Sequence, residues 1–303
     1  MITKLNYLSE KFRRDIYGYI GFCNLTGSIK DKPALMMVED LKKKGVKKGS
    51  WIIEGTAGNT GTGLAWYCKQ AGYKFIAVVP DKVSSEKIEK LKSVCEKVFI
   101  CPTVSRDHPD FYLKKCVDLA NDLNGIYIDQ FNNLSNVRAH EYYTALDIHR
   151  YFGQQPEVIF CGIGTGGTIK GLSNYFSKLP GKTDFIVGDP KGSIYHKTIN
   201  HTLLTTENFA IEGIGSSYIT PFFDYDIVKK AYAVNDNEAY QACRDFYKNE
   251  GICCGGSSGV QLTALTQYCC DNAIQKTAGK ILLILPDHGG NYIEKVYKEE
   301  ACI

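Results

Sequence analysis

CGIGTGGTIKG, from Cys161 to Gly171, is the stretch of this 303-residue chain that decides its fold class. It follows an apolar run and precedes a segment with the character of a helix. Gly162, Gly164 and Gly167 fit the pattern G-x-G-x-x-G, and Asp189 follows 22 residues after Gly167 (189 − 167). A glycine loop between a strand and a helix holds phosphate at the helix N-terminus, and with a later acidic residue it is the fingerprint of a dinucleotide site. The first question is which phosphate this loop binds.

Composition and charge are those of an ordinary folded protein. Hydrophobic residues make up 44% of the chain and charged residues 23%, and the net charge is +3. That charge is too small to indicate a nucleic-acid partner, and no apolar run reaches the ~20 residues of a membrane span. Twelve cysteines and no signal-peptide core predict reduced thiols in a cytoplasmic protein. No cysteine or histidine spacing predicts a metal site.

Strand-like and helix-like segments alternate along most of the chain. Apolar runs predict strands at 50–55, 73–80, 97–102, 184–190, 228–234 and 280–286. Helical spacing predicts helices at 59–72, 84–95, 109–123, 134–151, 235–249 and 257–272. This alternation predicts an α/β protein with parallel sheets covered by helices on both faces. Ligands of such sheets bind at the carboxyl ends of strands, where three glycine- and hydroxyl-rich loops occur, at 54–61, 162–168 and 255–259.

Several other stretches carry candidate chemistry. NLTGSIKDKPA places Lys30 in a Gly-Ser turn before a helix expected near Pro33, although a solvent-exposed loop lysine fits that stretch equally well. EGTAGNTGTGLA, from Glu54 to Ala65, opens a helix with a turn that can present backbone N–H groups to an anion. Gln130 in DQFNN and Ser257 in GGSSG follow. A capping or turn role is the alternative for these two residues.

In this order, the motifs resemble those of the fold-type II pyridoxal-phosphate enzymes, specifically the cysteine synthase and cystathionine β-synthase family. The resemblance extends from about Leu5 to Tyr297, and PDKVSSEKIEKL, GDPKGSI and LPDHGGNY are closer to the cystathionine β-synthase branch. It implies a tryptophan synthase β-like fold, in which two domains have parallel-rich twisted sheets covered by helices and the active site lies in the cleft between them. The expected domains are a large cofactor-phosphate domain, 1–20 with 145–303, and a smaller, mobile substrate-binding domain, 21–144.

The resemblance also assigns roles to single residues. Lys30 matches the lysine that holds the cofactor covalently and moves the Cα proton, Asn59 the partner of the ring's phenolic oxygen, and Ser257 the partner of the pyridine nitrogen. The phosphate cup comprises Gly164, Thr165, Gly166, Gly167 and Thr168. The substrate-carboxylate site comprises Thr56, Ala57, Asn59, Thr60 and Gln130. The glycine loop is therefore interpreted as a site for pyridoxal 5'-phosphate, because a dinucleotide site needs neither the lysine nor the two flanking threonines.

The implied reaction is β-replacement on serine, O-acetylserine or O-phosphoserine with a thiol or sulfide, by a lyase or transferase of amino-acid biosynthesis. A cystathionine β-synthase-like enzyme is expected first, and cysteine synthase is the alternative. A catalytically weak regulatory pseudoenzyme is the second alternative. We also expect a homodimer. No haem is expected, since the chain has no haem-binding extension before its first strand, and no regulatory domain follows Ile303.

Two residues depart from the family pattern. Ala57 stands where the family usually has serine, so a hydroxyl expected beside the substrate carboxylate and the leaving group is missing. Ser216 stands where the cystathionine β-synthase branch often has a larger aromatic residue. The first departure predicts a preference for good leaving groups over the hydroxyl of serine. The second argues against a second substrate as large as homocysteine.

Overall fold

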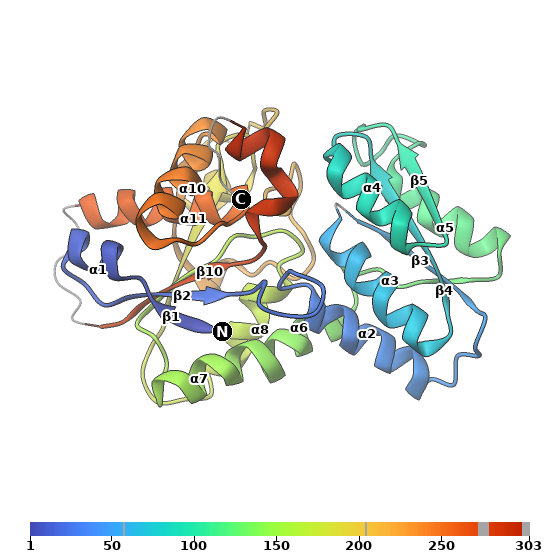
Figure 1. The fold of residues 1–303 in the computed structure, drawn as a ribbon, viewed down its shortest axis with the longest axis horizontal. Helices are drawn as coiled ribbons and strands as arrows, with labels where there is room; N and C mark the ends of the chain where they lie inside the picture. Colours follow the sequence, from blue (N-terminus) through green and yellow to red (C-terminus); the bar gives the residue numbers. More distant parts are fainter. Residues whose placement is uncertain (57, 204, 272–278, 299–303) are drawn as a thin grey trace. The chain divides into compact units, whose positions relative to one another are not determined.

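The computed structural model describes residues 1–303 except 57, 204, 272–278 and 299–303. It divides into two compact units: unit 1 is Met1–Cys23 with His140–Ile303, and unit 2 is Asn24–Ala139. Each unit is built on its own sheet (Figure 1). The predicted fold class, parallel-rich α/β sheets covered by helices, is confirmed. Among the residues described, no helix combines the length and the apolar character needed to cross a membrane.

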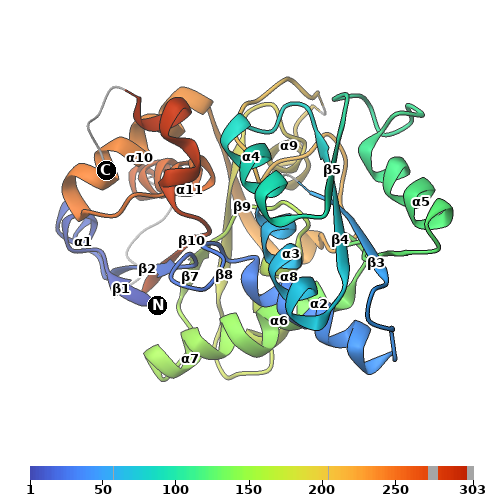
Figure 2. The same cartoon turned by 45° about the vertical axis from the view of Figure 1, so that its right-hand side comes forward.

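Unit 2 has a four-stranded parallel sheet in the order β5-β4-β3-β6. Its strands are β3 (Trp51–Gly55), β4 (Lys74–Pro80), β5 (Lys97–Cys101) and β6 (Ile126–Tyr127). Its helices are α2 (Asp31–Lys43), α3 (Asn59–Ala71), α4 (Ser85–Val94), α5 (Tyr112–Asp122) and α6 (Leu134–Ala139). Figures 1 and 2 show α2, α3 and α4 on one side of the strands and α5 on the other.

The alternation of side chains along the strands explains these two layers. Successive residues of a strand point to opposite faces. Ile52 of β3 belongs to the core under α2, α3 and α4, and its neighbour Ile53 belongs to the core under α5. On β4, Ala77 and Val78 are divided in the same way. Strands buried on both faces read as continuous apolar runs, which is why the sequence predicted them clearly.

Unit 1 has a six-stranded sheet in the order β1-β2-β10-β7-β8-β9. Strands β1 and β2 pair antiparallel, whereas the pairs β2–β10, β10–β7, β7–β8 and β8–β9 are parallel. The strands are β1 (Ile2–Lys4), β2 (Ile16–Ile20), β7 (Val158–Phe160), β8 (Asp184–Pro190), β9 (Val228–Val234) and β10 (Ile281–Leu285). Its α-helices are α1 (Asn6–Phe12), α7 (Leu146–Phe152), α8 (Gly167–Phe176), α9 (Tyr195–Ile199), α10 (Asp236–Glu250) and α11 (Gly256–Cys270).

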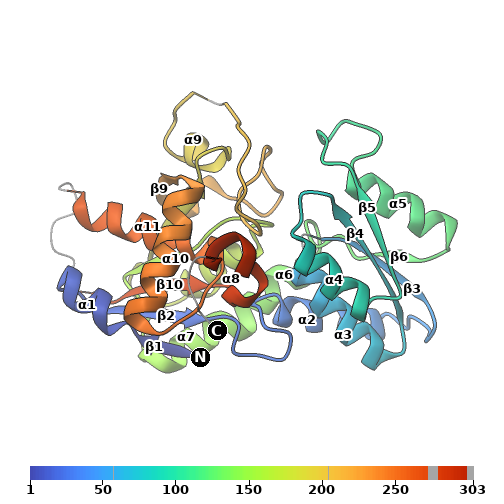
Figure 3. The same ribbon diagram turned by 45° about the horizontal axis from the view of Figure 1, so that its top comes forward.

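Shorter helical turns complete unit 1. They are the π-helix η1 (His140–Ala145), the 3-10 helices η2 (Tyr225–Ile227) and η3 (Gly289–Tyr292), and the π-helix η4 (Ile293–Tyr297). Helices α10 and α11 pack closely together (Figure 3), because Gly259 of α11 has no Cβ; one would lie 2.1 Å from the carbonyl oxygen of Ala239. The strands predicted at 184–190 and 228–234 are confirmed with the same bounds. The helix predicted at 134–151 is divided into α6, η1 and α7, a change of winding that apolar spacing does not reveal.

Candidate functional site

Lys30 follows a turn that the side chain of Asn24 holds in place. The Asn24 Nδ2 donates to the Ser28 carbonyl oxygen at 2.6 Å, and its Oδ1 accepts from the backbone N–H groups of Gly27 and Ser28 at 3.0 and 3.2 Å. Gly27 has a φ of 74°, a left-handed conformation that glycine adopts without strain. Lys30 is half-buried and directly precedes α2. The turn therefore fixes the backbone from which the lysine extends.

Close contact between α2 and α3 brings this lysine to the second predicted motif. A Cβ at Gly63 of α3 would lie 2.8 Å from the Cβ of Ala34 and 3.4 Å from the carbonyl oxygen of Lys30. Glycine at position 63 allows the first turns of the two helices to touch. Unit 2 thus places Lys30 beside the beginning of α3.

The turn that opens α3 is organised by Thr56. The Thr56 Oγ1 accepts from the backbone N–H groups of Gly58 and Gly61, both at 3.0 Å, and Gly58 has a φ of 120°. Half-buried Asn59 and buried Thr60 form the first turn of the 13-residue helix. The start of such a helix carries a partial positive charge and favours anions. Ala57, the other residue predicted in this turn, lies outside the described residues.

Gln130 belongs to a buried network that includes a carboxyl group the sequence reasoning missed. The Gln130 Nε2 donates to Glu54 Oε1 at 3.2 Å and to the Gly55 carbonyl oxygen at 2.7 Å, and its Oε1 accepts from Thr60 Oγ1 at 2.8 Å. Glu54 is fully buried, and burial raises the pKa of its carboxyl to about 8, although hydrogen bonds from Gln130 oppose the rise. Both amide hydrogens of Gln130 are therefore engaged inside unit 2. A carboxylate in an apolar strand next to a turn was the available signal for Glu54.

In unit 1, the predicted phosphate cup connects β7 to the first residues of α8. Gly166 has a φ of 85°, and Thr165 Oγ1 accepts from the backbone N–H of Gly167 at 3.2 Å. A Cβ at Gly164 would lie 2.4 Å from the Gly213 carbonyl oxygen, so the loop is packed tightly against a neighbouring segment. The loop presents backbone amides and threonine hydroxyls at a helix N-terminus, the arrangement that binds phosphate groups.

A buried histidine supports the last residue of the cup. The Thr168 Oγ1 lies 3.1 Å from His140 Nε2, and His140 Nδ1 lies 3.0 Å from Thr144 Oγ1. His140 is fully buried and is the first residue of the π-helix η1. Sequence reasoning missed it, because no periodicity distinguishes it from other helical residues between 134 and 151.

Ser257 is buried in the first turn of α11, and the side chain of Gln261 hydrogen-bonds this helix to Gly188 of β8. The Gln261 Oε1 accepts from the Gly188 N–H, and its Nε2 donates to the Gly188 carbonyl oxygen, both at 3.0 Å. A Cβ at Gly162 would also lie 3.0 Å from Gln261 Nε2. Unit 1 therefore brings α11, with Ser257 in its first turn, next to the start of the glycine loop.

Asp189, the acidic residue of the dinucleotide pattern, is hydrogen-bonded to another residue of unit 1. Asp189 ends β8 together with Pro190 and is fully buried. Its Oδ2 accepts from the His196 backbone N–H at 2.8 Å and lies 2.9 Å from His196 Nδ1. A dinucleotide site needs this carboxylate for the ribose hydroxyls. The contacts of Asp189 with His196 favour the interpretation of the loop as a site for a phosphate monoester.

Within each unit, the residues that lie close together fit pyridoxal phosphate. Unit 1 supplies a tightly packed amide loop for a phosphate and a buried hydroxyl at the start of α11, and unit 2 supplies Lys30 beside an anion-binding turn. In the described part of the chain, no group of three His, Cys, Asp or Glu residues could hold a metal ion. The cysteines in that part are free thiols.

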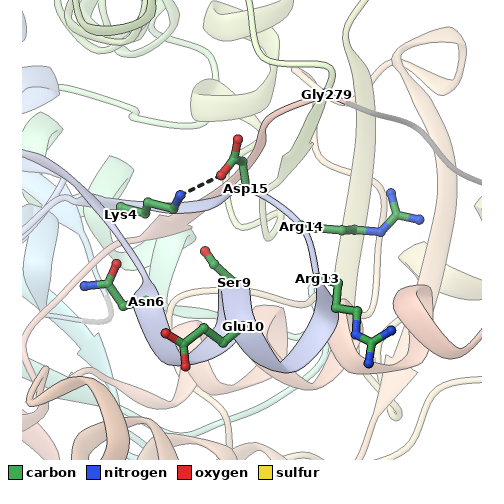
Figure 4. A pocket seen from close by; sticks show the side chains of 8 residues that line it. All are labelled: Lys4, Asn6, Ser9, Glu10, Arg13, Arg14, Asp15 and Gly279. Atoms are coloured by element: carbon green, nitrogen blue, oxygen red, sulfur yellow. Dashed lines mark hydrogen bonds and ion pairs between the residues drawn. The ribbon is translucent and has the colours of Figure 1, made fainter.

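A cavity of about 470 Å³ elsewhere in unit 1 is separate from these residues. It is lined by Lys4, Asn6, Ser9, Glu10, Arg13, Arg14, Asp15 and Gly279. Figure 4 shows the ion pair across it, in which Lys4 Nζ lies 2.7 Å from Asp15 Oδ1. Both of these side chains are about half exposed, so solvent screens the ion pair and it contributes little to the stability of the fold.

Comparisons with known proteins show the family to which the chain is similar. The family model described as pyridoxal-phosphate dependent enzyme matches residues 2–287. Cystathionine beta-synthase of Apis mellifera is 35% identical over 98% of this chain and 59% of its own length, so the chain spans less than two thirds of that relative. Cysteine synthase 1 of Neurospora crassa is 30% identical over 99% of this chain and 81% of its own. The crystal structure of an O-acetylserine dependent cystathionine beta-synthase from Helicobacter pylori matches with a TM-score of 0.82 and 29% identity, over 93% of this chain and 90% of that one.

Proposed function

The chain belongs to the pyridoxal-phosphate dependent enzymes, and we propose that it catalyses β-replacement on a serine-type amino acid. The amino-acid substrate is serine, O-acetylserine or O-phosphoserine, and the incoming group is a thiol or sulfide. The relatives named cystathionine beta-synthase and cysteine synthase support this reaction class. A cystathionine β-synthase-like activity is the first choice, because that name belongs to the relative with 35% identity.

The observation that carries the proposal is the buried hydroxyl of Ser257 at the start of α11. When bound, pyridoxal phosphate supplies an electron sink that weakens the bonds at the substrate Cα. Ser257 is the proposed partner of the ring nitrogen, and a hydroxyl is a weaker proton source than a carboxylate. A less fully protonated ring suits loss of a β-substituent, for which strong stabilisation of negative charge at Cα is unnecessary.

The two units have different proposed tasks. Unit 1 holds the cofactor phosphate through Gly164–Thr168 and the ring nitrogen through Ser257. Unit 2 supplies Lys30, which binds the cofactor covalently and moves a proton at the substrate Cα. Asn59 of the same unit hydrogen-bonds the phenolic oxygen of the ring.

The substrate carboxylate is assigned to the turn at the start of α3. Thr56, Ala57, Asn59 and Thr60 form this proposed site, and its backbone amides lie at the positive end of the helix. Gln130 acts on the site through Thr60, because its amide hydrogens are donated to Glu54 and Gly55.

The proposed leaving group and incoming group follow from Ala57 and Ser216, the two residues that depart from the family pattern. Ala57 offers no hydroxyl, so we propose O-acetylserine over serine; the Helicobacter pylori structure is named as an O-acetylserine dependent enzyme. Ser216 is small, and its backbone N–H donates to Ser193 Oγ at 3.0 Å. The small side chain favours the second candidate function, cysteine synthase, in which sulfide is the incoming group.

A cytoplasmic homodimer completes the proposal. The described cysteines are free thiols, as in a reducing compartment. Tyr142, Tyr143 and Tyr151, on η1 and α7, are 59%, 41% and 51% exposed. Exposed aromatic residues are enriched at protein interfaces. Light scattering of the purified protein tests the oligomeric state.

A substrate matrix tests the function. Serine, O-acetylserine and O-phosphoserine are each combined with sulfide and with homocysteine, and the products are identified by mass. We expect a thioether or cysteine product, formed fastest from O-acetylserine. A cofactor-loaded protein that forms no product with any pair would contradict the proposal and support the pseudoenzyme alternative.

A further inference from the structure

The proposed phosphate cup is covered on one side by residues 220–224, a segment outside every motif considered above. Gly166 is the left-handed residue of the cup, with a φ of 85°. If it carried a Cβ, that atom would lie 3.1 Å from the carbonyl carbon and the Cβ of Phe222 and 3.2 Å from the backbone nitrogen of Phe223. The backbone of the covering segment therefore lies directly against the bend of the cup, so the position of the segment limits the position of the cup.

The first end of the covering segment is held by a buried tyrosine of α9. The Tyr195 hydroxyl lies 2.7 Å from Thr220 Oγ1 and accepts from the Thr220 backbone N–H at 3.3 Å. Tyr195 is fully buried and Thr220 is 1% exposed. The Phe223 backbone N–H donates to the Thr220 carbonyl oxygen at 3.0 Å, and the rings of Phe223 and Tyr195 lie 5.1 Å apart. Neutral contacts therefore fix residues 220–223.

The other end of the covering segment is held by an ion pair with the helix that the cup opens. Lys170 Nζ lies 2.7 Å from Asp224 Oδ2. Lys170 is one turn after Gly166, because its backbone N–H donates to the Gly166 carbonyl oxygen at 3.0 Å. The two side chains are 32% and 37% exposed, so solvent screens the pair only in part. The hydrogen bond from Lys170 lowers the pKa of the Asp224 carboxyl, so both groups are charged at neutral pH.

The contacts of this lysine indicate what its charge does. Lys170 belongs to the second turn of α8, but its ammonium group is bonded to Asp224 and is neutralised there. Its charge is therefore used to hold the covering segment. Backbone amides bind a phosphate well when they are already arranged around its position, because less freedom is then lost on binding. A segment held at both ends, with Gly166 packed against its middle, restricts the cup in this way.

We propose that the ion pair between Lys170 and Asp224 positions the phosphate cup, by holding residues 220–224 against Gly166, and so sets the preference of the site for a phosphorylated cofactor. This inference rests on the proposed function, which assigns the cofactor phosphate to Gly164–Thr168. Lys170 and Asp224 are positioning residues, since they act on the phosphate through the cup.

The test compares two ligands that differ only in the phosphate. Pyridoxal phosphate and pyridoxal share the ring and the aldehyde. Full-length protein freed of cofactor is titrated with each, and binding is followed by visible absorbance. The variants are Lys170→Met, Asp224→Asn, the double variant, and Lys170→Arg, which keeps the charge. Lys170→Gln replaces Lys170→Met if the latter does not fold.

Lys178→Met is the matched control. Lys178 follows the opposite end of α8 from the cup, and its Nζ lies 2.6 Å from Glu141 Oε1. This variant also removes one ion pair from the surroundings of the same helix, but not from the covering segment.

We expect Lys170→Met and Asp224→Asn each to weaken binding of pyridoxal phosphate about three- to tenfold, as for loss of one partly screened ion pair, and to leave pyridoxal binding nearly unchanged. The double variant should lose no more than either single variant, because both substitutions break the same pair. Lys170→Arg should recover most of the affinity, and Lys178→Met should bind both ligands like the wild type.

Four results would overturn the proposal. Tighter binding of pyridoxal phosphate by Asp224→Asn would show that Lys170, once released, attracts the phosphate directly. Equal losses for the two ligands would show general support of the fold, and additive losses would show that the two residues act separately. Unchanged affinity in both single variants would show that the pair does not position the cup.

Failure of the proposed function gives a different result. A wild type that prefers pyridoxal phosphate to pyridoxal but yields no product with any thiol or sulfide would refute β-replacement alone. The effect of the ion pair is still measured there, because the readout is cofactor binding and not turnover. A wild type that binds the two aldehydes equally well would refute the assignment of the phosphate to the cup, and this inference with it.

Discussion

At the scale of single residues, the candidate site consists of polar groups that are buried or half-buried and held by specific contacts. Lys30, Asn59 and Ser257 could be proposed from the sequence because each belongs to a motif of neighbouring residues. Glu54 offered only the signal of a carboxylate in an apolar strand, and His140 offered none, since their partners Gln130 and Thr168 are 76 and 28 residues away along the chain. Contacts of that kind are set by the fold and leave no local pattern.

Lys30→Ala should abolish β-replacement and covalent retention of the cofactor. The lysine is the proposed covalent attachment point, and alanine has no amine. Noncovalent binding should persist more weakly, because the cup at Gly164–Thr168 belongs to unit 1 and does not include Lys30. Retention is measured by visible absorbance after gel filtration, and turnover with O-acetylserine and sulfide. A variant that keeps full turnover would show that another residue holds the cofactor.

The stability of the protein should depend on pH through Glu54. The pKa of this carboxyl rises from 4.5 to about 8 on folding, so the folded state binds the proton more tightly. Its contribution to stability is therefore lost as the pH rises from about 4.5 to about 8. Between about pH 5 and pH 8, the wild type should lose about 2–5 kcal/mol more unfolding free energy than Glu54→Gln. Urea denaturation of both proteins measures the difference, and parallel losses would refute it.

At the scale of secondary-structure elements, the site is built at the starts of helices. The cup opens α8, the Thr56 turn opens α3, and Ser257 lies in the first turn of α11. The sequence predicted α3 and α11 and the strands around them, because buried parallel strands and amphipathic helices have distinct periodicities. It did not predict β1, β2 or the π-helical turn at His140–Ala145. These elements are short or irregular, and tertiary contacts determine them.

Gly164→Ala should disturb cofactor binding without a general loss of folding. The new Cβ would lie 2.4 Å from the Gly213 carbonyl oxygen, so the cup must move. We expect at least roughly tenfold weaker binding of pyridoxal phosphate, comparable to loss of one hydrogen bond to a charged group. Gly153→Ala is the control: φ is 69° there and a Cβ meets nothing within 4 Å. Cofactor titration and thermal denaturation of both variants separate the two effects, and equal affinities would contradict the prediction.

At the scale of the whole molecule, the two units differ in continuity. Unit 2 is one segment, Asn24–Ala139, whereas unit 1 is made from both ends of the chain. Composition gave no signal of this boundary, since no linker-like stretch occurs between the units. Unit 2 contains its own strands and two apolar cores, one on each face of its sheet.

The segment 24–139 should therefore fold on its own. We expect it to show helical and strand circular dichroism and one cooperative urea transition, because its core residues all belong to the segment. The fragment 140–303 is the matched comparison and should not fold, since β10 pairs with β2 on one side. A segment 24–139 without a cooperative transition would show that unit 2 depends on the rest of the chain.

The position of β10 between β2 and β7 has a consequence for synthesis on the ribosome. Strand β2 leaves the ribosome before unit 2 is made, but the strand that joins it to β7 is made more than two hundred residues later. The consecutive strands of unit 2 can meet long before that. A nascent chain interrupted before Ile281 thus carries a finished unit 2 and an open sheet in unit 1 that exposes the edges of β2 and β7. Exposed strand edges of this kind favour aggregation and chaperone binding, so we expect chains translated through Leu285 to be less prone to both.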